Sequence, residues 1–186
     1  MGLVLASNSP RRQELLARLT SDFVVVPSRI DESESGTPAE RAVATARAKA
    51  RAVGRSERGV IIGADTIVVV GRDVLEKPAT RDQAKEMLRL LSGRPHSVFT
   101  GLCVWDTESG TERTVCEETL VTFRRLDEEE IEAYLDTGEY HDKAGAYAIQ
   151  GVAAKFVSGI QGDYANVMGL PLCRLALLLR EVGVRL

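Results

Sequence analysis

The chain has 186 residues, of which 44% are hydrophobic and 27% are charged. This size suits one domain of ordinary size or two lobes sharing a cleft, and the composition excludes a disordered chain, a collagen and a coiled coil. The 24 basic and 27 acidic residues give a net charge of -3, which argues against a protein whose main task is to grip duplex nucleic acid.

The sequence shows no sign of a membrane span, a leader or a cysteine framework. No apolar run approaches the roughly 20 residues of a membrane-spanning helix, and the absence of a basic N-terminal segment predicts that there is no signal peptide. Cys103, Cys116 and Cys173 are widely spaced and form no CxxC pair. We therefore expect buried free thiols in a reducing cytoplasm rather than a disulfide or a zinc site.

Charge is distributed unevenly along the chain. Residues 1–55 carry nine Arg and Lys against six Asp and Glu, whereas residues 106–142 carry three against thirteen. The first segment is typical of a basic active lobe, and we expect the second to form an acidic, solvated face.

Short strands and capped helices alternate along the chain. Strands are expected over 3–6, 60–62 and 67–70, where apolar or β-branched residues stand between Gly or Ser. After the first of these strands, Ser9 is a natural N-cap and Pro10 a natural first residue of a helix.

The later helices have start signals of their own. Thr37 and Glu40 form a capping box, and Thr80 repeats the N-cap signal. The helices expected after the first one cover about 38–54, 81–92, 127–137 and 172–182.

Residues 96–106 and 111–123 flank Glu108-Ser109-Gly110, which predicts a β-hairpin. Strands that alternate with helices, together with this hairpin, predict an α/β fold with a mixed central sheet and flanking helices. The chain has no internal repeat and no low-complexity linker, so we predict a single domain over 1–186.

The segment between the first strand and the first helix has the character of a phosphate site. A helix N-terminus, the hydroxyls of Ser7 and Ser9, and the guanidinium groups of Arg11 and Arg12 would meet around one point. The alternative is an ordinary capped helix with two surface arginines. A Walker A lysine and a GxGxxG motif are both missing, so the usual mononucleotide and dinucleotide loops are excluded.

Gly63-Ala64-Asp65-Thr66 separates two strongly apolar runs. A carboxylate buried there without a partner would cost several kcal/mol. We therefore expect Asp65 to lie where strands end at a cleft, where it would hold a metal or activate water, and we expect the small residues before it to let a ligand approach the backbone. An Asp in a tight turn is the alternative.

Other charged candidates are weaker in isolation. Glu76 and Lys77 stand side by side and would suit a metal and a phosphate, although a surface ion pair explains them equally well. Lys49 lies in the Ala-rich helix and is a similar candidate. The alternative is that its side chain is simply solvated. Asp31 and Glu32 offer two more acids, and Asp31 could equally cap a turn.

Residues 142–151 combine small residues and glycines, which make a poor core but a good lining for a flat ligand. Gln150 carries a donor and an acceptor that complement the N3–H and the adjacent carbonyl of a uracil or thymine edge. A polar loop residue is the alternative. His96 and His141 lie far apart in sequence and receive no role, and no Ser/His/Asp pattern is present.

Seven short segments stand in an order that is more specific than any one of them. They are residues 6–12, 63–66, 76–78, 91–93, 142–147, 149–151 and 166–171, which read ASNSPRR, GADT, EKP, LSG, DKAGAY, IQG and NVMGLP. Together they resemble the Maf family of nucleotide pyrophosphatases over nearly the whole chain. The resemblance implies two lobes around a cleft, similar to inosine triphosphate pyrophosphatases.

The resemblance also implies an activity. It is the divalent-metal-dependent hydrolysis of a nucleoside triphosphate to the monophosphate and pyrophosphate, commonly by a homodimer. The Glu-Lys-Pro and Ala-Ile-Gln-Gly segments are similar to the dTTP/UTP branch rather than to the 7-methyl-GTP branch. The expected function is therefore a house-cleaning pyrophosphatase for dTTP, UTP and modified pyrimidine triphosphates.

The matched positions imply roles for individual residues. Asp65 would be the proton acceptor, and Arg12, Thr66 and Gln150 would determine specificity. Phosphate and metal contacts would fall at Ser7, Arg11, Glu32, Lys49 and Lys77.

We expect Mg²⁺ or Mn²⁺ as the cofactor, held by Asp65 with help from Glu32 or Glu76, because hard oxygen ligands suit these ions. Asn8 and Ala148 depart from the family, since relatives often have Gly there, and Ala148 would narrow the base pocket.

Two other functions compete with this one. The first is a nucleotide-binding regulator of cell division or septum formation, and the second is a pyrophosphatase of the 7-methyl-GTP branch. Carboxylates at Asp65 and Glu76 near four basic residues favour an enzyme over a pure binder of triphosphate. Nucleic-acid binding is disfavoured by the net charge and by a total of only nine aromatic residues.

Overall fold

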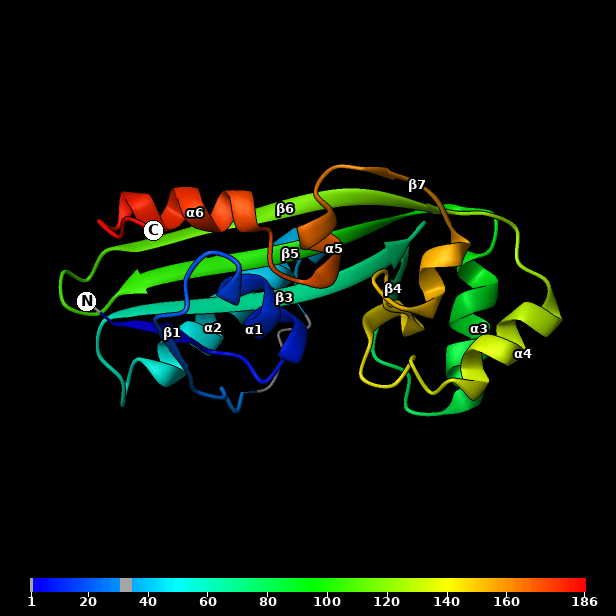
Figure 1. Cartoon of the computed structure of the whole chain (residues 1–186), viewed down its shortest axis with the longest axis horizontal. Helices are drawn as coiled ribbons and strands as arrows, with labels where there is room; N and C mark the ends of the chain where they lie inside the picture. The colour runs from blue at the N-terminus through cyan, green and yellow to red at the C-terminus, as the bar shows by residue number, and fades with distance from the viewer. Residues whose placement is uncertain (1, 31–34) are drawn as a thin grey trace. The chain divides into compact units, whose positions relative to one another are not determined.

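The computed structural model describes residues 2–30 and 35–186. Over these residues the chain forms a seven-stranded mixed sheet with the order β2-β1-β3-β5-β6-β7, and β4 pairs with β3 (Figure 1). The strands are β1 (Leu3–Leu5), β2 (Phe23–Val25), β3 (Val60–Val70), β4 (Asp73–Leu75), β5 (Pro95–Asp106), β6 (Glu112–Phe123) and β7 (Val157–Gln161). The helices are α1 (Pro10–Ala17), α2 (Pro38–Val53), α3 (Arg81–Leu91), α4 (Glu128–Asp136), α5 (Tyr164–Met168) and α6 (Leu172–Glu181), with short 3₁₀ turns η1 (Ala144–Ala146) and η2 (Val152–Phe156).

The sheet contains both parallel and antiparallel pairs. β1 is parallel to β2 and to β3, whereas β4 is antiparallel to β3 and β7 is antiparallel to β6. β5 and β6 are neighbours, and the Asp106 carboxylate accepts the backbone N–H groups of Glu108 and Ser109 in the turn that joins them. The predicted α/β class, mixed sheet and hairpin are confirmed.

Capping side chains set the starts of α2, α3 and α4. The Thr37 hydroxyl accepts the N–H of Glu40, whose carboxylate accepts the N–H of Thr37. Asp127 and Glu130 form the same reciprocal box at the start of α4. These bonds satisfy N–H groups that have no partner within a helix.

The chain divides into two compact units. Unit 1 consists of the described residues of 1–66, 100–117 and 169–186, and unit 2 consists of residues 67–99 and 118–168. β3, β5 and β6 each contribute residues to both units.

Helix α2 packs very closely on β3 and β5 within unit 1. A Cβ atom at Gly63 would lie 2.1 Å from the carbonyl oxygen of Ala46, and one at Gly101 would lie 2.3 Å from that of Ala42. The alanines of α2 and these glycines therefore bring the helix backbone against the strands. The expectation that small residues before Asp65 make room for a ligand is wrong at Gly63, because that space is filled by α2.

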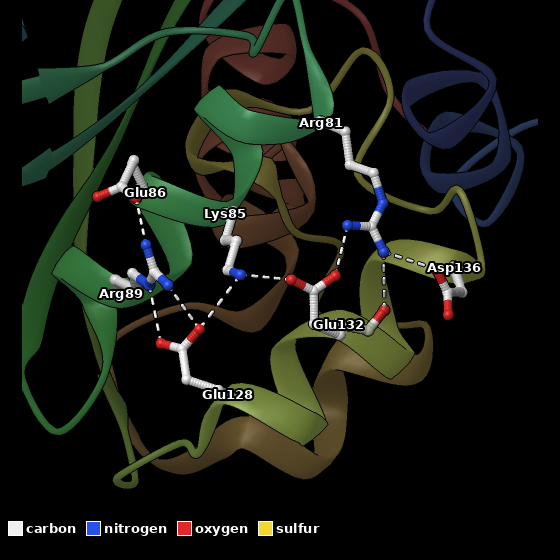
Figure 2. A network of polar contacts seen from close by, with 7 residues as sticks. All are labelled: Arg81, Lys85, Glu86, Arg89, Glu128, Glu132 and Asp136. Carbon is white, nitrogen blue, oxygen red and sulfur yellow. Dashed lines mark hydrogen bonds and ion pairs between the residues drawn. The ribbon is translucent and has the colours of Figure 1, made fainter.

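Helices α3 and α4 of unit 2 carry complementary rows of charge (Figure 2). Each row repeats every fourth residue, so that its members share one helix face. The ion pairs are Arg81 with Glu132 and Asp136, Lys85 with Glu128 and Glu132, and Arg89 with Glu128 and, on its own helix, Glu86. We call this set the α3–α4 ladder.

The ladder changes the interpretation of the acidic segment 106–142. Its α4 carboxylates were expected to be solvated, but they bind the cations of α3. Exposed fractions of these side chains range from 23% for Lys85 to 73% for Asp136, so the pairs still lie at the surface. The acidic row of α4 is therefore paired with a basic row on α3.

Two further expectations concern cysteines and membranes. Cys103, Cys116 and Cys173 are free thiols, but only Cys103 is buried and Cys173 is exposed, so the expected burial holds for one of the three. Within the described part of the chain, no helix has both the length and the apolar character that crossing a bilayer requires.

Candidate active site

Asp65 and Lys49 form a buried ion pair in unit 1. Lys49 Nζ on α2 lies 2.6 Å from Asp65 Oδ1 on β3, and the exposed fractions of the two side chains are 13% and 7%. The expectation that Asp65 lies where a strand ends is wrong, because β3 runs unbroken from Val60 to Val70. The pairing explains how the strand tolerates an acid in its interior, since a buried charge is stabilised by a close opposite charge.

Lys49 reaches Asp65 because of the way α2 packs. The close approach of the helix at Gly63 places the last turns of α2 beside the middle of β3. A long side chain from this helix can then bring its ammonium group to a carboxylate on the strand. At this distance the ammonium offsets the charge of the buried carboxylate.

Arg12 lies at the centre of a second group of contacts in unit 1. Its Nε donates to the carbonyl oxygen of Gly169 at 2.8 Å, Nη1 donates to Ser7 Oγ at 3.3 Å, and Nη2 donates to Thr66 Oγ1 at 3.1 Å. Thr66 Oγ1 in turn shares a 2.9 Å hydrogen bond with the buried Thr100. Three segments distant in sequence thus hold one guanidinium in a fixed orientation.

The start of α1 has the predicted form. Ser9 is the N-cap and Pro10 the first helical residue. The Ser7 hydroxyl accepts the N–H of Ser9 at 3.2 Å, so the hydroxyl that binds Arg12 also shapes the turn before the helix. Arg11 follows in the first turn and is partly buried. The positive end of a helix and two arginines therefore occur together, which suits an anion.

Glu76 and Lys77 lie in unit 2, in the segment between β4 and α3. Both side chains are exposed, and Pro78 after them is buried. The carbonyl oxygen of Glu76 accepts the N–H of Gly145 at 3.3 Å. This bond joins the Glu-Lys-Pro segment to η1, in the segment that precedes Gln150.

Gln150 is exposed at a tight turn of unit 2. The turn is closed by the Gly151 N–H, which donates to the carbonyl oxygen of Ala148 at 3.1 Å. Ala148 and Ile149 are buried. The turn is therefore anchored by its apolar residues while the amide of Gln150 is presented outward.

His96, which the sequence left without a role, lies beneath this segment. Its Nε2 is 2.8 Å from the hydroxyl of Tyr147, and its ring packs edge-on against Phe123 and Tyr147. Burial lowers the pKa of His96 to about 4, so the ring is neutral near pH 7. His96 thus serves to position Tyr147 rather than to carry charge.

Cys103 lies on β5 and packs in a core of unit 1 with Ala46 and Ile61. Burial, as the largest cause, raises the pKa of the Cys103 thiol to about 12. A thiol in that state is not a nucleophile near neutral pH. Covalent catalysis by Cys103 is therefore excluded.

The carboxylate of Asp65 is the donor through which the described residues of unit 1 fit Mg²⁺ or Mn²⁺. Among the residues that the structure describes, no three His, Cys, Asp or Glu side chains gather into a metal-holding group. Magnesium is usually bound by one or two carboxylates together with water and substrate phosphates, rather than by a cage of protein ligands. Asp65 supplies one such carboxylate, so the described residues fit an ion that arrives with its triphosphate.

Some of the predicted residues contact one another, and the predicted residues are divided between the chain's two units. Ser7, Arg12 and Thr66 form one group, and Lys49 and Asp65 form another. The predicted residues in unit 1 are Ser7, Arg11, Arg12, Lys49, Asp65 and Thr66, and those in unit 2 are Glu76, Lys77 and Gln150. Glu32 and Asp31 lie outside the described residues.

Thr100 and the carbonyl of Gly169 were missed as members of the Arg12 group. Thr100 carries a weak signal in the sequence, because it is a polar residue in a strand where alternate positions such as Val98 and Leu102 are buried. The role of a backbone carbonyl 157 positions from Arg12 has no sequence signal of its own.

Comparison with known proteins identifies the family. A sequence model described as "Maf-like protein" matches residues 2–182. A protein from Thermococcus gammatolerans named "dTTP/UTP pyrophosphatase" is 52% identical over 97% of this chain and 96% of its own length. Relatives with the same name from Moorella thermoacetica and Pelotomaculum thermopropionicum are 52% and 49% identical, each over at least 95% of both chains. The names agree with the expected branch, and the chain belongs to the Maf family.

Proposed function

We propose that this protein hydrolyses dTTP and UTP to the nucleoside monophosphate and pyrophosphate. The observation that carries the proposal is the pair between Lys49 on α2 and the buried Asp65 on β3, where the next residue of the strand, Thr66, binds Arg12. The Lys49–Asp65 pair supplies a carboxylate, and the Arg12 group supplies a guanidinium in a fixed orientation, both of which suit the hydrolysis of a phosphate anhydride. The dTTP/UTP name of the relatives supports pyrimidine triphosphates as the substrates.

Asp65 acts as the proton acceptor in this reaction. It orients a water molecule and takes its proton as the oxygen attacks the α-phosphorus, and the bond to the bridging oxygen of pyrophosphate breaks. Lys49 holds the carboxylate in place and remains near the proton that Asp65 gains. Such catalysis depends on positioning and electrostatics, so it needs no covalent nucleophile.

The cationic groups stabilise the charge that develops on the leaving pyrophosphate. The positive charges come from Arg11, Arg12, Lys49 and Lys77. The Ser7 hydroxyl adds an O–H donor, and the N-terminus of α1 adds backbone N–H donors. The fixed contacts of Arg12 support its part, because a group already oriented needs no rearrangement during the reaction.

A divalent metal ion, when bound by Asp65 with Glu32 or Glu76, would neutralise triphosphate charge and polarise the reacting phosphoryl group. Gln150 reads the pyrimidine edge through its amide, and Thr66 with Arg12 contributes to specificity. The family resemblance also supports a homodimer in the cytoplasm. Analytical ultracentrifugation of the full chain tests the dimer, since a single species at monomer mass would refute it.

A panel of nucleoside triphosphates tests the proposed reaction. We expect pyrophosphate and monophosphate from dTTP and UTP with Mg²⁺ or Mn²⁺ present, and loss of this release when a chelator is added. Modified pyrimidine triphosphates belong in the same panel. Binding of nucleotides with no turnover would favour a nucleotide-binding regulator, and activity confined to 7-methyl-GTP would refute the branch.

A further inference from the structure

The turn that carries Gln150 is held by a carboxylate from a distant segment. Glu139 Oε2 accepts the N–H of Val152 at 2.8 Å, and Glu139 Oε1 accepts the N–H of Ala153 at 3.3 Å. These are the first two N–H groups of η2, which begins directly after the turn. The carboxylate therefore fixes the backbone immediately beyond Gln150.

Gly151 shows how closely Glu139 approaches the turn. A Cβ atom at position 151 would lie 1.9 Å from Glu139 Oε2 and 2.4 Å from Glu139 Cδ. The backbone of Gly151 has a φ of -103° and a ψ of -149°, so it is not in the left-handed region that favours glycine. Space for the carboxylate is thus a reason for a glycine next to Gln150.

Glu139 is itself held in place by the end of α4. Gly138 has a φ of +70° and reverses the chain after the helix. The N–H of Glu139 then donates to Thr137 Oγ1 at 3.2 Å, and the Thr137 hydroxyl donates to the carbonyl oxygen of Tyr134 at 2.6 Å. The Glu139 side chain therefore extends from a backbone that hydrogen bonds hold in place.

We propose that Glu139 is a positioning residue for pyrimidine recognition, acting through the backbone N–H groups that directly follow Gly151 to fix the amide of Gln150. The buried His96–Tyr147 bond holds the chain on the other side of the turn. The inference rests on the proposed function, because it assumes that Gln150 reads the base. It adds a residue, and a reason for Gly151, that no motif of the sequence indicated.

The test compares dTTP with N3-methyl-dTTP, in which the N3–H that Gln150 would recognise is replaced by a methyl group. The variants are Gln150→Ala, Glu139→Ala and the double variant, with Glu129→Ala on the exposed surface of α4 as the matched control. The measured quantity is kcat/KM for each substrate, separated into kcat and KM.

We expect Gln150→Ala to lower kcat/KM for dTTP by about 10- to 100-fold, because it removes hydrogen bonds to the base. Glu139→Ala should lower it about 10-fold, mainly through a higher KM, and the double variant should be no worse than Gln150→Ala, because both act on one contact. Neither variant should change hydrolysis of N3-methyl-dTTP by more than about 2-fold.

Equal losses on both substrates in Glu139→Ala, or losses that multiply in the double variant, would overturn the positioning role. Glu139→Gln keeps one acceptor for the N–H of Val152 and replaces Glu139→Ala in the test if that variant does not fold. We expect it to lower kcat/KM for dTTP by a smaller factor and to leave kcat/KM for N3-methyl-dTTP unchanged. A third outcome separates this inference from the proposed reaction. If the wild-type protein releases pyrophosphate but Gln150→Ala keeps the full preference for dTTP over N3-methyl-dTTP, Gln150 does not read the base. This inference would then be refuted, and the proposed reaction would stand.

A second measurement is independent of turnover. Amide hydrogen exchange should become faster in Glu139→Ala at Gly151, Val152 and Ala153, and stay unchanged in α3. If the parent protein fails to hydrolyse any triphosphate, the proposed function fails, while this local change in exchange would still show that Glu139 fixes the turn. Unchanged exchange at residues 151–153 would refute the fixing role itself.

Discussion

Ion pairs occur in two very different settings in this molecule. Lys49 and Asp65 form one pair in the interior of unit 1, with exposed fractions of 13% and 7%. The α3–α4 ladder of unit 2 has many pairs, but its side chains are 23% to 73% exposed. A buried pair is costly to break because removal of one partner leaves a charge in a low dielectric, whereas exposed pairs are screened by water and salt.

The comparison separates charge that serves chemistry from charge that serves packing. A protein that only needed to hold α2 against β3 would be better served by apolar residues of similar volume at positions 49 and 65. The retained pair therefore indicates a use for a carboxylate and an ammonium group at that place. The ladder has no such implication, since surface ion pairs between helices are common and individually weak.

The largest expected effect is that of Asp65→Asn. This change keeps the shape of the side chain but removes the proton acceptor, so we expect kcat for dTTP to fall by about 10²- to 10⁴-fold. Steady-state kinetics measures the loss, and circular dichroism checks that the variant is folded. Turnover within a few-fold of the parent would remove Asp65 from the mechanism and leave the buried pair without a catalytic purpose.

Lys49→Met should lower the free energy of unfolding by about 3–5 kcal/mol, because it removes the cation that offsets a buried carboxylate. Urea denaturation measures this change. The matched double variant, Lys49→Met with Asp65→Leu, should regain most of the stability but none of the activity. A double variant as unstable as the single one would show that the loss comes from packing and not from charge.

The free energy of unfolding should depend on pH through His96 in a range where the ladder carboxylates do not contribute. Burial lowers its pKa to about 4 in the folded protein, from 6.5 in an exposed histidine. The unfolded chain therefore binds a proton first, so stability is lost as pH falls from 6.5 toward 4, by an amount that approaches about 3 kcal/mol. Thermal unfolding between pH 7 and pH 4 measures it, and His96→Gln should flatten the curve in that window. An equally steep curve in the variant would assign the pH dependence to other groups.

The smallest expected effect is in the ladder. Glu128→Gln should lower the melting temperature at pH 7 by less than about 4 °C and leave dTTP turnover unchanged. Hydrogen bonds from Arg89 are the first cause that lowers the pKa of Glu128 to about 2, so its contribution is present above pH 4.5 and is lost as pH falls toward 2. Differential scanning calorimetry at low and high salt measures the change in melting temperature, with Glu129→Gln as control. A lower melting temperature of Glu128→Gln that persists in 1 M salt would contradict a screened surface pair.

Local signals in the sequence were enough to place most of the longer elements. The capping box at Thr37 predicted α2 and the N-cap signal at Thr80 predicted α3, because an N-cap is a property of a few adjacent residues. The 3-residue strands β2 and β4 and the exposed strand β7 were not predicted. Strands this short, or without a buried face, leave no clear alternation of apolar residues.

The candidate site was predictable as a set of residues but not as an arrangement. Motif order identified Asp65, yet its place inside β3 depends on Lys49, which lies 16 residues earlier and approaches through the packing of α2. In the same way, each row of the ladder can be read on its own helix from the spacing of four, but nothing local says that α3 and α4 face each other. Pairings between distant segments are set by tertiary packing, which is why the structure was needed to find them.

The central claim is that the protein directs water onto the α-phosphorus of a pyrimidine triphosphate, and hydrolysis in ¹⁸O-labelled water tests it most directly. The products of dTTP are separated, and the position of the label is measured by mass spectrometry. We predict one ¹⁸O atom in the monophosphate and none in the pyrophosphate. Label in the pyrophosphate, or release of orthophosphate in its place, would contradict the account.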